Sequence, residues 1–299
     1  MDYRKKLIVA PGSKPRLRDV DPAWTGKHAS EAEAAEETAG TLERITRQQQ
    51  LLYGERKHGL LIVLQGIDAA GKDGTCWHVL KAMNPQGTTV AGFKQPTPQE
   101  LEHDFLWRVH PHAPGLGQVA VFNRSHYEDV LVVRVHGLAP KSVWSKRYGL
   151  INDFEALLAD SGVAILKFFL YISPEEQLER FRQRLDDPAR QWKISDSDYT
   201  ERARWDDYVK AYEDMLAKCS TDRAPWFVIP SNHKWFRNLA VSQIVAATLE
   251  DLKMKLPAPS VDLDAIRKQY HRAAEAEGKR GKAAKPPKTG KGAREKASA

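Results

Sequence analysis

Cysteine is scarce in this sequence, and its apolar residues never form a long uninterrupted run. The two cysteines, Cys76 and Cys219, lie far apart without a Cys-x-x-Cys pair, which argues against a thiolate zinc site and is typical of a reducing compartment. No stretch reaches the roughly eighteen apolar residues that a membrane-spanning helix needs, and no apolar signal segment opens the chain. We therefore expect a cytoplasmic protein without a membrane partner.

Acidic residues are sparse at the C-terminal end, and this imbalance accounts for most of the net charge of +7. Residues 271–299 contain nine Lys or Arg and three Glu, whereas residues 1–270 contain 37 Lys or Arg and 36 Asp or Glu. The tail has little to bury, so we expect it to be disordered from about residue 271. It is either a polyanion-binding arm or a solvated tail, and we expect nucleic acid to bind only through it.

The most informative stretch is an apolar run that ends in glycines and a lysine. Residues 60–64 are continuously apolar, which is typical of a strand buried in a parallel sheet. The glycines that follow allow backbone N–H groups to approach a ligand, and a helix beginning near Lys72 adds the positive end of its dipole. The spacing from Gly66 to Lys72 matches a phosphate-binding P-loop, although Asp73 stands where that motif has Ser or Thr. The alternative, a turn without a ligand, leaves Asp68, Lys72 and Asp73 without a role.

A second polar cluster follows the strand predicted at residues 118–122. Ligands of open α/β sheets bind beyond the carboxyl ends of the strands, so we expect Asn123 and the residues after it to lie beside the P-loop. Arg124 can neutralise phosphate oxygens, and carboxylates nearby can hold magnesium. The candidate metal ligands are Asp68, Glu128 and Asp129. The alternative is a helix cap with an ion pair.

A basic helix is predicted to begin at Pro174, the first-turn position that proline favours. We expect Leu178, Phe181 and Leu185 to face the core, because they recur at i, i+3 and i+7. Arg180 and Arg184 then stack on another side, where like charges repel unless a polyanion neutralises them. The polar stretch beyond this helix can close as a lid over a phosphate chain. The alternative is a solvated basic helix.

Strand and helix patterns alternate along the chain. The expected strands cover residues 60–64, 88–93, 118–122, 163–172 and 226–230, and the expected helices include residues 31–53, 98–110, 127–135, 141–159, 198–216 and 239–252. This alternation predicts an α/β fold, a three-layer α/β/α sandwich with a parallel sheet. We expect a basic, extended arm over residues 1–30, a catalytic domain over 31–257 with a lid at about 180–197, and a C-terminal extension over 258–299.

Three ordered motifs together resemble the polyphosphate kinase 2 family. They span residues 66–74, 123–131 and 184–193, and the resemblance runs from about Tyr3 to Leu256. It implies a P-loop nucleotide-kinase-like fold that moves phosphate between inorganic polyphosphate and nucleotides, with Mg²⁺ as cofactor and Mn²⁺ as a substitute. By the family's motif Asp68 would bind metal or orient the nucleophilic phosphate, Lys72 would hold phosphate, and Arg124 would bridge the reacting groups.

The resemblance and the residue patterns give three sets of candidate site residues. The catalytic set is Asp68, Lys72 and Arg124. The residues expected to bind phosphate or nucleotide are Gly66, Ala69, Ala70, Gly71, Lys72, Asp73, Gly74, Lys94, Asn123, Arg124 and Tyr127. The lid residues expected to bind polyphosphate are Arg180, Arg184, Arg190 and Lys193.

One departure from the family pattern bears on the subclass. Many members carry Asp-Arg at the second motif, whereas this chain has Asn123-Arg124, similar to the class that phosphorylates both nucleoside mono- and diphosphates. We expect reversible transfer from polyphosphate to AMP and ADP, adenine and guanine nucleotides as acceptors, and a homodimer or homotetramer. The alternatives are an ATP-dependent nucleoside monophosphate kinase of the same fold and a non-catalytic polyanion or nucleic-acid binder.

Overall fold

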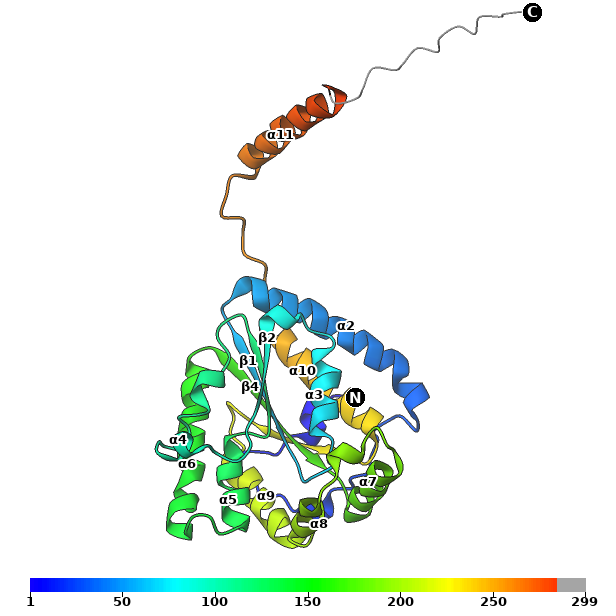
Figure 1. Ribbon diagram of the computed structural model, residues 1–299, viewed down its shortest axis with the longest axis vertical. Coiled ribbons are helices and arrows are strands. Elements are labelled where there is room, and N and C mark those ends of the chain that lie inside the picture. The colour runs from blue at the N-terminus through cyan, green and yellow to red at the C-terminus, as the bar shows by residue number, and fades with distance from the viewer. Residues whose placement is uncertain (284–299) are drawn as a thin grey trace, which may run out of the picture. The chain divides into compact units, whose positions relative to one another are not determined.

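Five parallel strands form one sheet within residues 1–256 (Figure 1). The computed structural model describes residues 1–283, which fall into two units that divide after Leu256. The strands are β1 (Gly59–Gln65), β2 (Thr88–Gly92), β3 (Val119–Asn123), β4 (Val163–Tyr171) and β5 (Trp226–Pro230). Their order across the sheet is β2-β3-β1-β4-β5. The strand that leads into the P-loop is therefore central, as its unbroken apolar run predicted.

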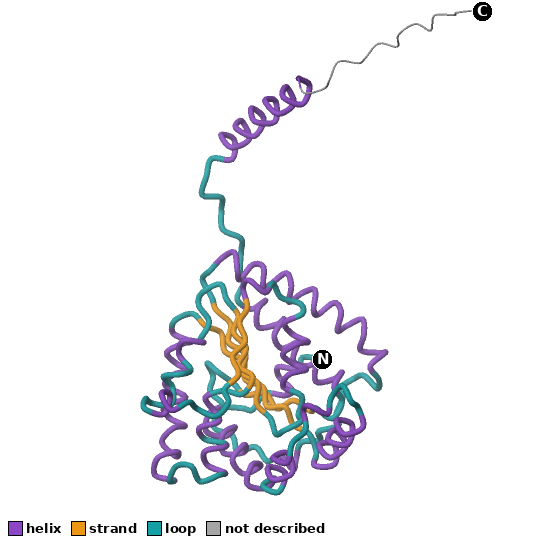
Figure 2. The backbone as a smooth tube through the Cα atoms, viewed as in Figure 1, coloured by secondary structure: helices purple, strands orange, loops and turns teal. Residues whose placement is uncertain are grey.

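Alternate side chains of β1 belong to two separate hydrophobic cores. Leu60, Ile62 and Leu64 pack in one core, and Leu61 and Val63 pack in the other, because successive strand side chains point to opposite faces. The first core is covered by α2 (Glu31–Glu55), α3 (Lys72–Leu80) and α10 (Lys234–Asp251), and the second by α6 (Lys141–Asp160) and α9 (Trp205–Cys219). Figure 2 shows the strands between these helices. The predicted three-layer α/β/α sandwich is confirmed.

Three predicted helices are interrupted in the structure. The helix expected over residues 98–110 is α4 (Pro98–Leu101) followed by turns, where the Asp104 side chain accepts a hydrogen bond from the backbone of Leu106 at 2.9 Å. Such local bonds compete with helix formation. The helix expected over 127–135 is a 3₁₀ turn (His126–Asp129) and then α5 (Val132–Val135). The helix expected over 198–216 is α8 (Asp196–Arg202) and α9, separated by two residues.

The N-terminal segment is anchored in the core, which the expectation of an arm over the surface missed. It forms α1 (Tyr3–Leu7), whose two terminal side chains are buried. Val9 then donates a backbone hydrogen bond of 2.8 Å to Trp226 in β5. Buried apolar side chains and a backbone hydrogen bond to β5 hold this segment in place. The prolines and basic residues around it predicted an exposed segment instead.

The unit after Leu256 contains one helix, α11 (Leu263–Ala283). The expectation of disorder from about residue 271 is wrong as far as Ala283, and the remaining positions of the predicted tail, 284–299, lie outside the described residues. The residues of α11 whose burial is described are exposed. Among the described residues, no helix combines the length and the apolar character needed to cross a membrane.

Candidate active site

The P-loop connects β1 to α3 and presents the open end of that helix. Gly71 is the N-cap of α3 with φ of 103°, and no side chain caps the helix there. A helix N-terminus without a side-chain cap has free N–H groups and a positive dipole end, and both favour an anion. The ammonium group of Lys72 donates to the backbone oxygen of Gly66 at 2.6 Å, so the loop holds it at this end of the helix.

Lys72 is the cation at the centre of the site. Lys72 is only 8% exposed. Burial first, and then the nearby Arg124, lower the pKa of Lys72 to about 8, although Asp68 and Glu128 oppose the shift. A lysine in this state gains from a bound anion, because an opposite charge favours the protonated form.

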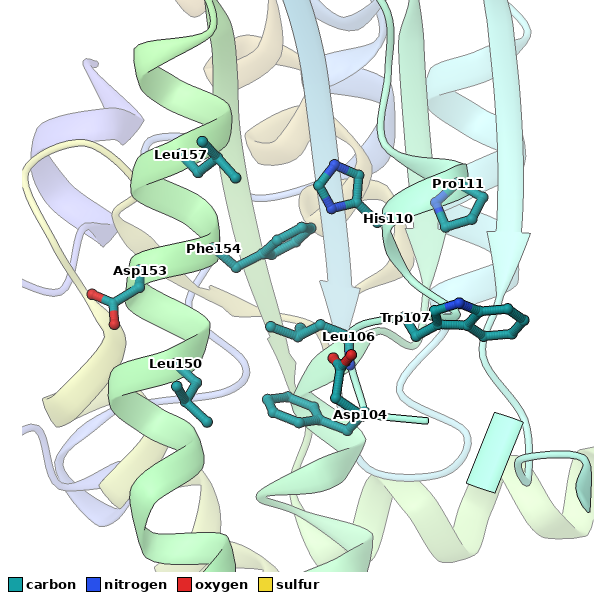
Figure 3. A pocket seen from close by; sticks show the side chains of 10 residues that line it. Asp104, Leu106, Trp107, His110, Pro111, Leu150, Asp153, Phe154 and Leu157 are labelled. Atoms are coloured by element: carbon teal, nitrogen blue, oxygen red, sulfur yellow. The ribbon is translucent and has the colours of Figure 1, made fainter. Parts of the chain in front are cut away.

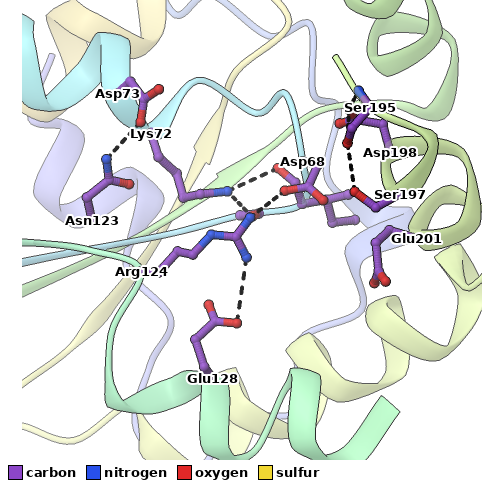
Figure 4. A network of polar contacts seen from close by, with 12 residues as sticks. Asp68, Lys72, Asp73, Asn123, Arg124, Glu128, Ser195, Ser197, Asp198 and Glu201 are labelled. Carbon is purple, nitrogen blue, oxygen red and sulfur yellow. Dashed lines mark hydrogen bonds and ion pairs between the residues drawn. The ribbon is translucent and has the colours of Figure 1, made fainter. Parts of the chain in front are cut away.

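Arg124 follows β3 and lies beside Asp68 and Glu128 (Figure 4). One terminal nitrogen lies 2.7 Å from Asp68 Oδ1, and the other lies 3.7 Å from Glu128 Oε2. Its backbone φ is 63°, a region that non-glycine residues seldom adopt. Burial favours a lower pKa for Arg124, but Glu128 and Asp68 outweigh it and raise the pKa. The guanidinium is therefore held charged beside the P-loop.

Asp73 joins three parts of the site. Its Oδ1 accepts a hydrogen bond of 2.8 Å from the amide of Asn123, and its Oδ2 lies 3.7 Å from the ammonium of Lys193. The bond from Asn123 contributes most to lowering the pKa of Asp73; burial opposes the shift, and Lys193 adds to the lowering. The residue that stands in place of the usual Ser or Thr thus connects the first turn of α3 to β3 and to Lys193.

A polar cavity of about 990 Å³ contains most of these groups, although Glu128 does not line it. Its lining includes Asp68, Ala69, Gly71, Lys72, Asp73, Gly74, Lys94, Asn123, Arg124, Arg180, Arg184, Arg190 and Lys193. A second hollow of about 850 Å³ lies between residues 104–111 and α6 (Figure 3). Leucine and aromatic side chains line most of that hollow, so we place the phosphate chemistry in the polar cavity.

Comparisons with known proteins identify the family of this chain. Residues 28–257 match the model of the family described as Polyphosphate kinase 2 (PPK2). The chain belongs to the polyphosphate kinase 2 family. It is 48% identical over 263 residues to the AMP/ADP-polyphosphate phosphotransferase of Meiothermus ruber, covering 88% of this chain and 98% of that protein.

Two further relatives cover nearly the same length. The ADP-polyphosphate phosphotransferase of Rhodopseudomonas palustris is 46% identical over 270 residues, covering 85% of this chain and 92% of that protein. The crystal structure of polyphosphate kinase 2 from Arthrobacter aurescens TC1 superposes with a TM-score of 0.88 at 41% identity, covering 91% of this chain and 97% of that one. The resemblance seen in the sequence motifs is thereby confirmed.

Tyr127 does not reach the cavity of this polyphosphate kinase 2 member, so its assignment as a nucleotide contact is wrong. The side chain is fully buried. Its hydroxyl donates to Glu155 at 2.8 Å and accepts from Lys167 at 2.8 Å. Burial favours a higher pKa for Glu155, but Lys167 and His126 outweigh it and lower the pKa. Tyr127 therefore belongs to a buried polar cluster under β4, where each charge has a partner.

Asp129 also lies apart from the other candidate metal ligands. Its Oδ1 is 2.7 Å from Arg147, and it does not line the polar cavity. Burial raises the pKa of Asp129 to about 6, although Arg147 opposes the shift. Within residues 1–283 no three His, Cys, Asp or Glu side chains gather as metal ligands would. Asp68 and Glu128, which Arg124 bridges, are the carboxylates that the fold brings together.

The helix α7 (Pro174–Asp186), within which the lid is predicted to begin, buries a different face from the one expected. Leu178 and Leu185 are each 48% exposed, whereas Phe181 and Arg180 are buried. The Arg180 guanidinium donates to the backbone oxygens of Ala69, Ala70, Ser231 and Asn232 and pairs with Glu176. These carbonyls offset the cost of burying a charge. Arg180 thus fastens α7 to the P-loop and still borders the cavity.

Two further candidates, Arg184 and Arg190, form ion pairs within residues 184–198. Arg184 lies 3.3 Å from Asp198 and donates to the backbone oxygen of Lys193. Arg190 lies 2.9 Å from Asp187. Both arginines line the cavity, as Arg180 and Lys193 do, so these four basic side chains share one cavity with the P-loop.

Sequence analysis missed Lys234 and Arg237, which also line the cavity. They lie in the first turns of α10, immediately beyond the carboxyl end of β5. The same rule that located Arg124, a polar residue after a parallel strand, applies to them. The closing helix was expected to begin at residue 239, which left both residues in an unassigned loop.

Proposed function

We propose that this chain is a polyphosphate:nucleotide phosphotransferase that moves the terminal phosphoryl group of inorganic polyphosphate reversibly to AMP and to ADP. The observation that carries the proposal is the convergence of Lys72, Arg124 and Asp68 in one polar cavity at the open N-terminus of α3. The Meiothermus ruber relative, named for both AMP and ADP, supports the choice of acceptors.

The reaction is an in-line displacement at phosphorus. A phosphate oxygen of the nucleotide attacks the terminal phosphorus of the chain, and the bond from that phosphorus to the bridging oxygen breaks. The shortened polyphosphate leaves with the electron pair. The nucleophile is already an anion, so positioning and charge neutralisation supply the rate. Lys72 and the free N–H groups of α3 hold the donor, and Arg124 neutralises the group in transfer.

The donor set of the cavity fits a magnesium ion that is held mainly by substrate. Mg²⁺ keeps several waters and binds through one or two carboxylates together with phosphate oxygens. Asp68 lines the cavity and would supply one carboxylate, with Glu128 as a second candidate. When bound, the ion neutralises phosphate charge, and Mn²⁺ would replace it. We retain Asp129 as the weakest of the three metal assignments, because Arg147 engages its carboxylate.

The amide at position 123 fits the aspartate at position 73. Asn123 donates to Asp73 at 2.8 Å, whereas a carboxylate at position 123 would place two acceptors of like charge against each other. We therefore infer that Asn123 and Asp73 act as a pair that positions the first turn of α3.

The test of the proposed function is a nucleotide chromatogram from the purified protein with Mg²⁺, long-chain polyphosphate and AMP, without ATP. We expect ADP first and ATP later. If AMP remains unchanged while ADP yields ATP, the acceptor range is that of a diphosphate-specific enzyme. No product from either nucleotide would contradict the proposal. Transfer from ATP to AMP would then favour the ATP-dependent kinase, and salt-sensitive binding lost on removing residues 271–299 would favour the polyanion binder.

The pH dependence of transfer should report the state of Lys72. Because the pKa of Lys72 is lowered to about 8, the free enzyme loses this positive charge as the pH rises through about 8. We expect kcat/KM for polyphosphate to fall above that pH, since kcat/KM reflects the free enzyme. The corresponding fall in kcat should lie at higher pH, because the bound polyanion favours protonated Lys72. A kcat/KM that stays constant from about pH 7 to about pH 10 would contradict this role.

A further inference from the structure

Arg237 is a buried arginine without an acidic partner. Arg237 is only 3% exposed. Its recorded hydrogen bonds go to neutral oxygens, to Asn238 at 2.8 and 3.2 Å and to the backbone of Ala70 at 3.5 Å. A guanidinium has five N–H donors, so these bonds leave donors unused. Among residues 1–283, no carboxylate lies within ion-pair distance of Arg237.

The charged side chain that acts on Arg237 is also positive, and the carboxylate of Glu176 in this region pairs with Arg180. Burial, and then Arg180, lower the pKa of Arg237 to about 9. Lys234 lies one turn earlier on α10, and its pKa is lowered by burial first and then by Arg180 and Arg190, against a weaker effect of Glu176. The first turn of α10 contains no acidic residue, and its N-cap makes no side-chain bond. A buried charge needs a partner, and here a polyanion in the cavity is the partner that fits.

The strand order places this cationic group on the opposite side of the P-loop from Arg124. The loop follows the central strand β1. Arg124 follows β3 on one side of it, whereas α10 follows β5, which lies beyond β4 on the other side. Arg237 nevertheless touches the loop, because a Cβ at Gly71 would lie 1.9 Å from its Nη1. The loop therefore has a cation on each side.

We infer that Arg237, with Lys234 at the rim, binds the phosphate groups of the donor polyphosphate that lie beyond the one transferred. This assignment rests on the proposed function and adds a direction to it. The acceptor nucleotide lies toward Arg124 and Lys94, and the donor chain extends from Lys72 toward α10. Because the shortened chain is the leaving group, these residues hold it before and after the phosphorus–oxygen bond breaks. Arg237 and Lys234 thereby make the enzyme selective for donors that carry further phosphate groups beyond the one that is transferred.

The experiment measures KM and kcat for ATP formation from ADP with long-chain polyphosphate and with tripolyphosphate. The variants are Arg237→Met, Lys234→Met and the control Lys210→Met, whose lysine pairs with Asp207 on the surface of α9. We expect Arg237→Met to raise KM for both donors about tenfold or more, because the variant loses a charged hydrogen bond to the donor. Lys234→Met should raise KM about threefold for the long chain only. KM for ADP should stay unchanged in both.

The outcomes separate this inference from the proposed function. Wild-type protein that makes no ATP from polyphosphate overturns both. Wild-type transfer with an unchanged polyphosphate KM in Arg237→Met, or with a raised KM for ADP instead, overturns the inference alone. If Arg237→Met fails to fold, Lys234→Met decides, because Lys234 lines the cavity outside the hydrophobic core and is only partly covered, so its replacement leaves the core intact. Partial recovery of the polyphosphate KM in Arg237→Lys would support a charge contact over a purely structural role.

Discussion

Replacing Lys72 by methionine should lower kcat for transfer from polyphosphate to ADP by about 100- to 1,000-fold. Methionine keeps most of the side-chain length and apolar contact but removes the charge. The ammonium is held 2.6 Å from the Gly66 carbonyl, at the N-terminal end of α3. The methionine variant has no positive charge at this position. The measurement is the initial rate of ATP formation at saturating ADP and polyphosphate.

The control for this variant is Lys210→Met, which removes a lysine of α9 that is 68% exposed. Its rate should match that of the wild type, and both variants should remain folded at the assay temperature. A Lys72→Met enzyme that retains more than about a tenth of the wild-type kcat would show that the P-loop backbone and Arg124 suffice, and the catalytic role of Lys72 would be withdrawn.

The parts of the site that sequence analysis located are those whose position follows from local rules. The run before Gly66 predicts a central strand, and the glycines and Lys72 after it predict an anion site at a helix start. Arg124 follows a second parallel strand, and the topology of such sheets brings it to the same edge. These inferences need no knowledge of distant contacts, and the structure places Lys72 and Arg124 in one cavity.

The errors occur where a distant partner decides the position of a side chain. Spacing alone assigned Leu178 and Leu185 to the core, but backbone carbonyls from the P-loop and from the segment after β5 draw Arg180 inward instead. Tyr127 adjoins Arg124 in sequence, yet Glu155 from α6 and Lys167 from β4 bind its hydroxyl in the interior. No periodicity within one segment contains information about carbonyls and carboxylates from others.

Replacing Arg124 by methionine should reduce transfer at least about 100-fold, with AMP or ADP as acceptor. We propose Arg124 as the group that contacts both reacting phosphates. It lies between Asp68 and Glu128, at 2.7 and 3.7 Å. The variant loses the fork of donors that matches phosphate oxygens. Arg124→Lys retains a charge without that fork, so its rate should fall between those of the wild type and Arg124→Met.

Loss of Arg124 should also make stability more sensitive to pH, which provides an independent readout. Burial raises the pKa of Glu128, and Arg124 is the largest of the groups that oppose this rise. Without the arginine the folded-state pKa should rise further. A group with a raised folded-state pKa stabilises the fold at low pH and loses that contribution as pH increases through the raised value. Arg124→Met should therefore lose more thermal stability than the wild type does as the pH rises above the ordinary pKa of a glutamate.

Arg147→Met is the matched control, because Arg147 also pairs with a carboxylate of the segment after β3, Asp129, at 2.7 Å. It lies outside the polar cavity, so its replacement should leave kcat within a few-fold of the wild type. Equal losses in Arg124→Met and Arg147→Met would mean that ion pairing in this segment acts through the fold alone. A large loss confined to Arg124→Met, in protein that remains folded at the assay pH, would support Arg124 as the residue that contacts the phosphoryl group in transfer.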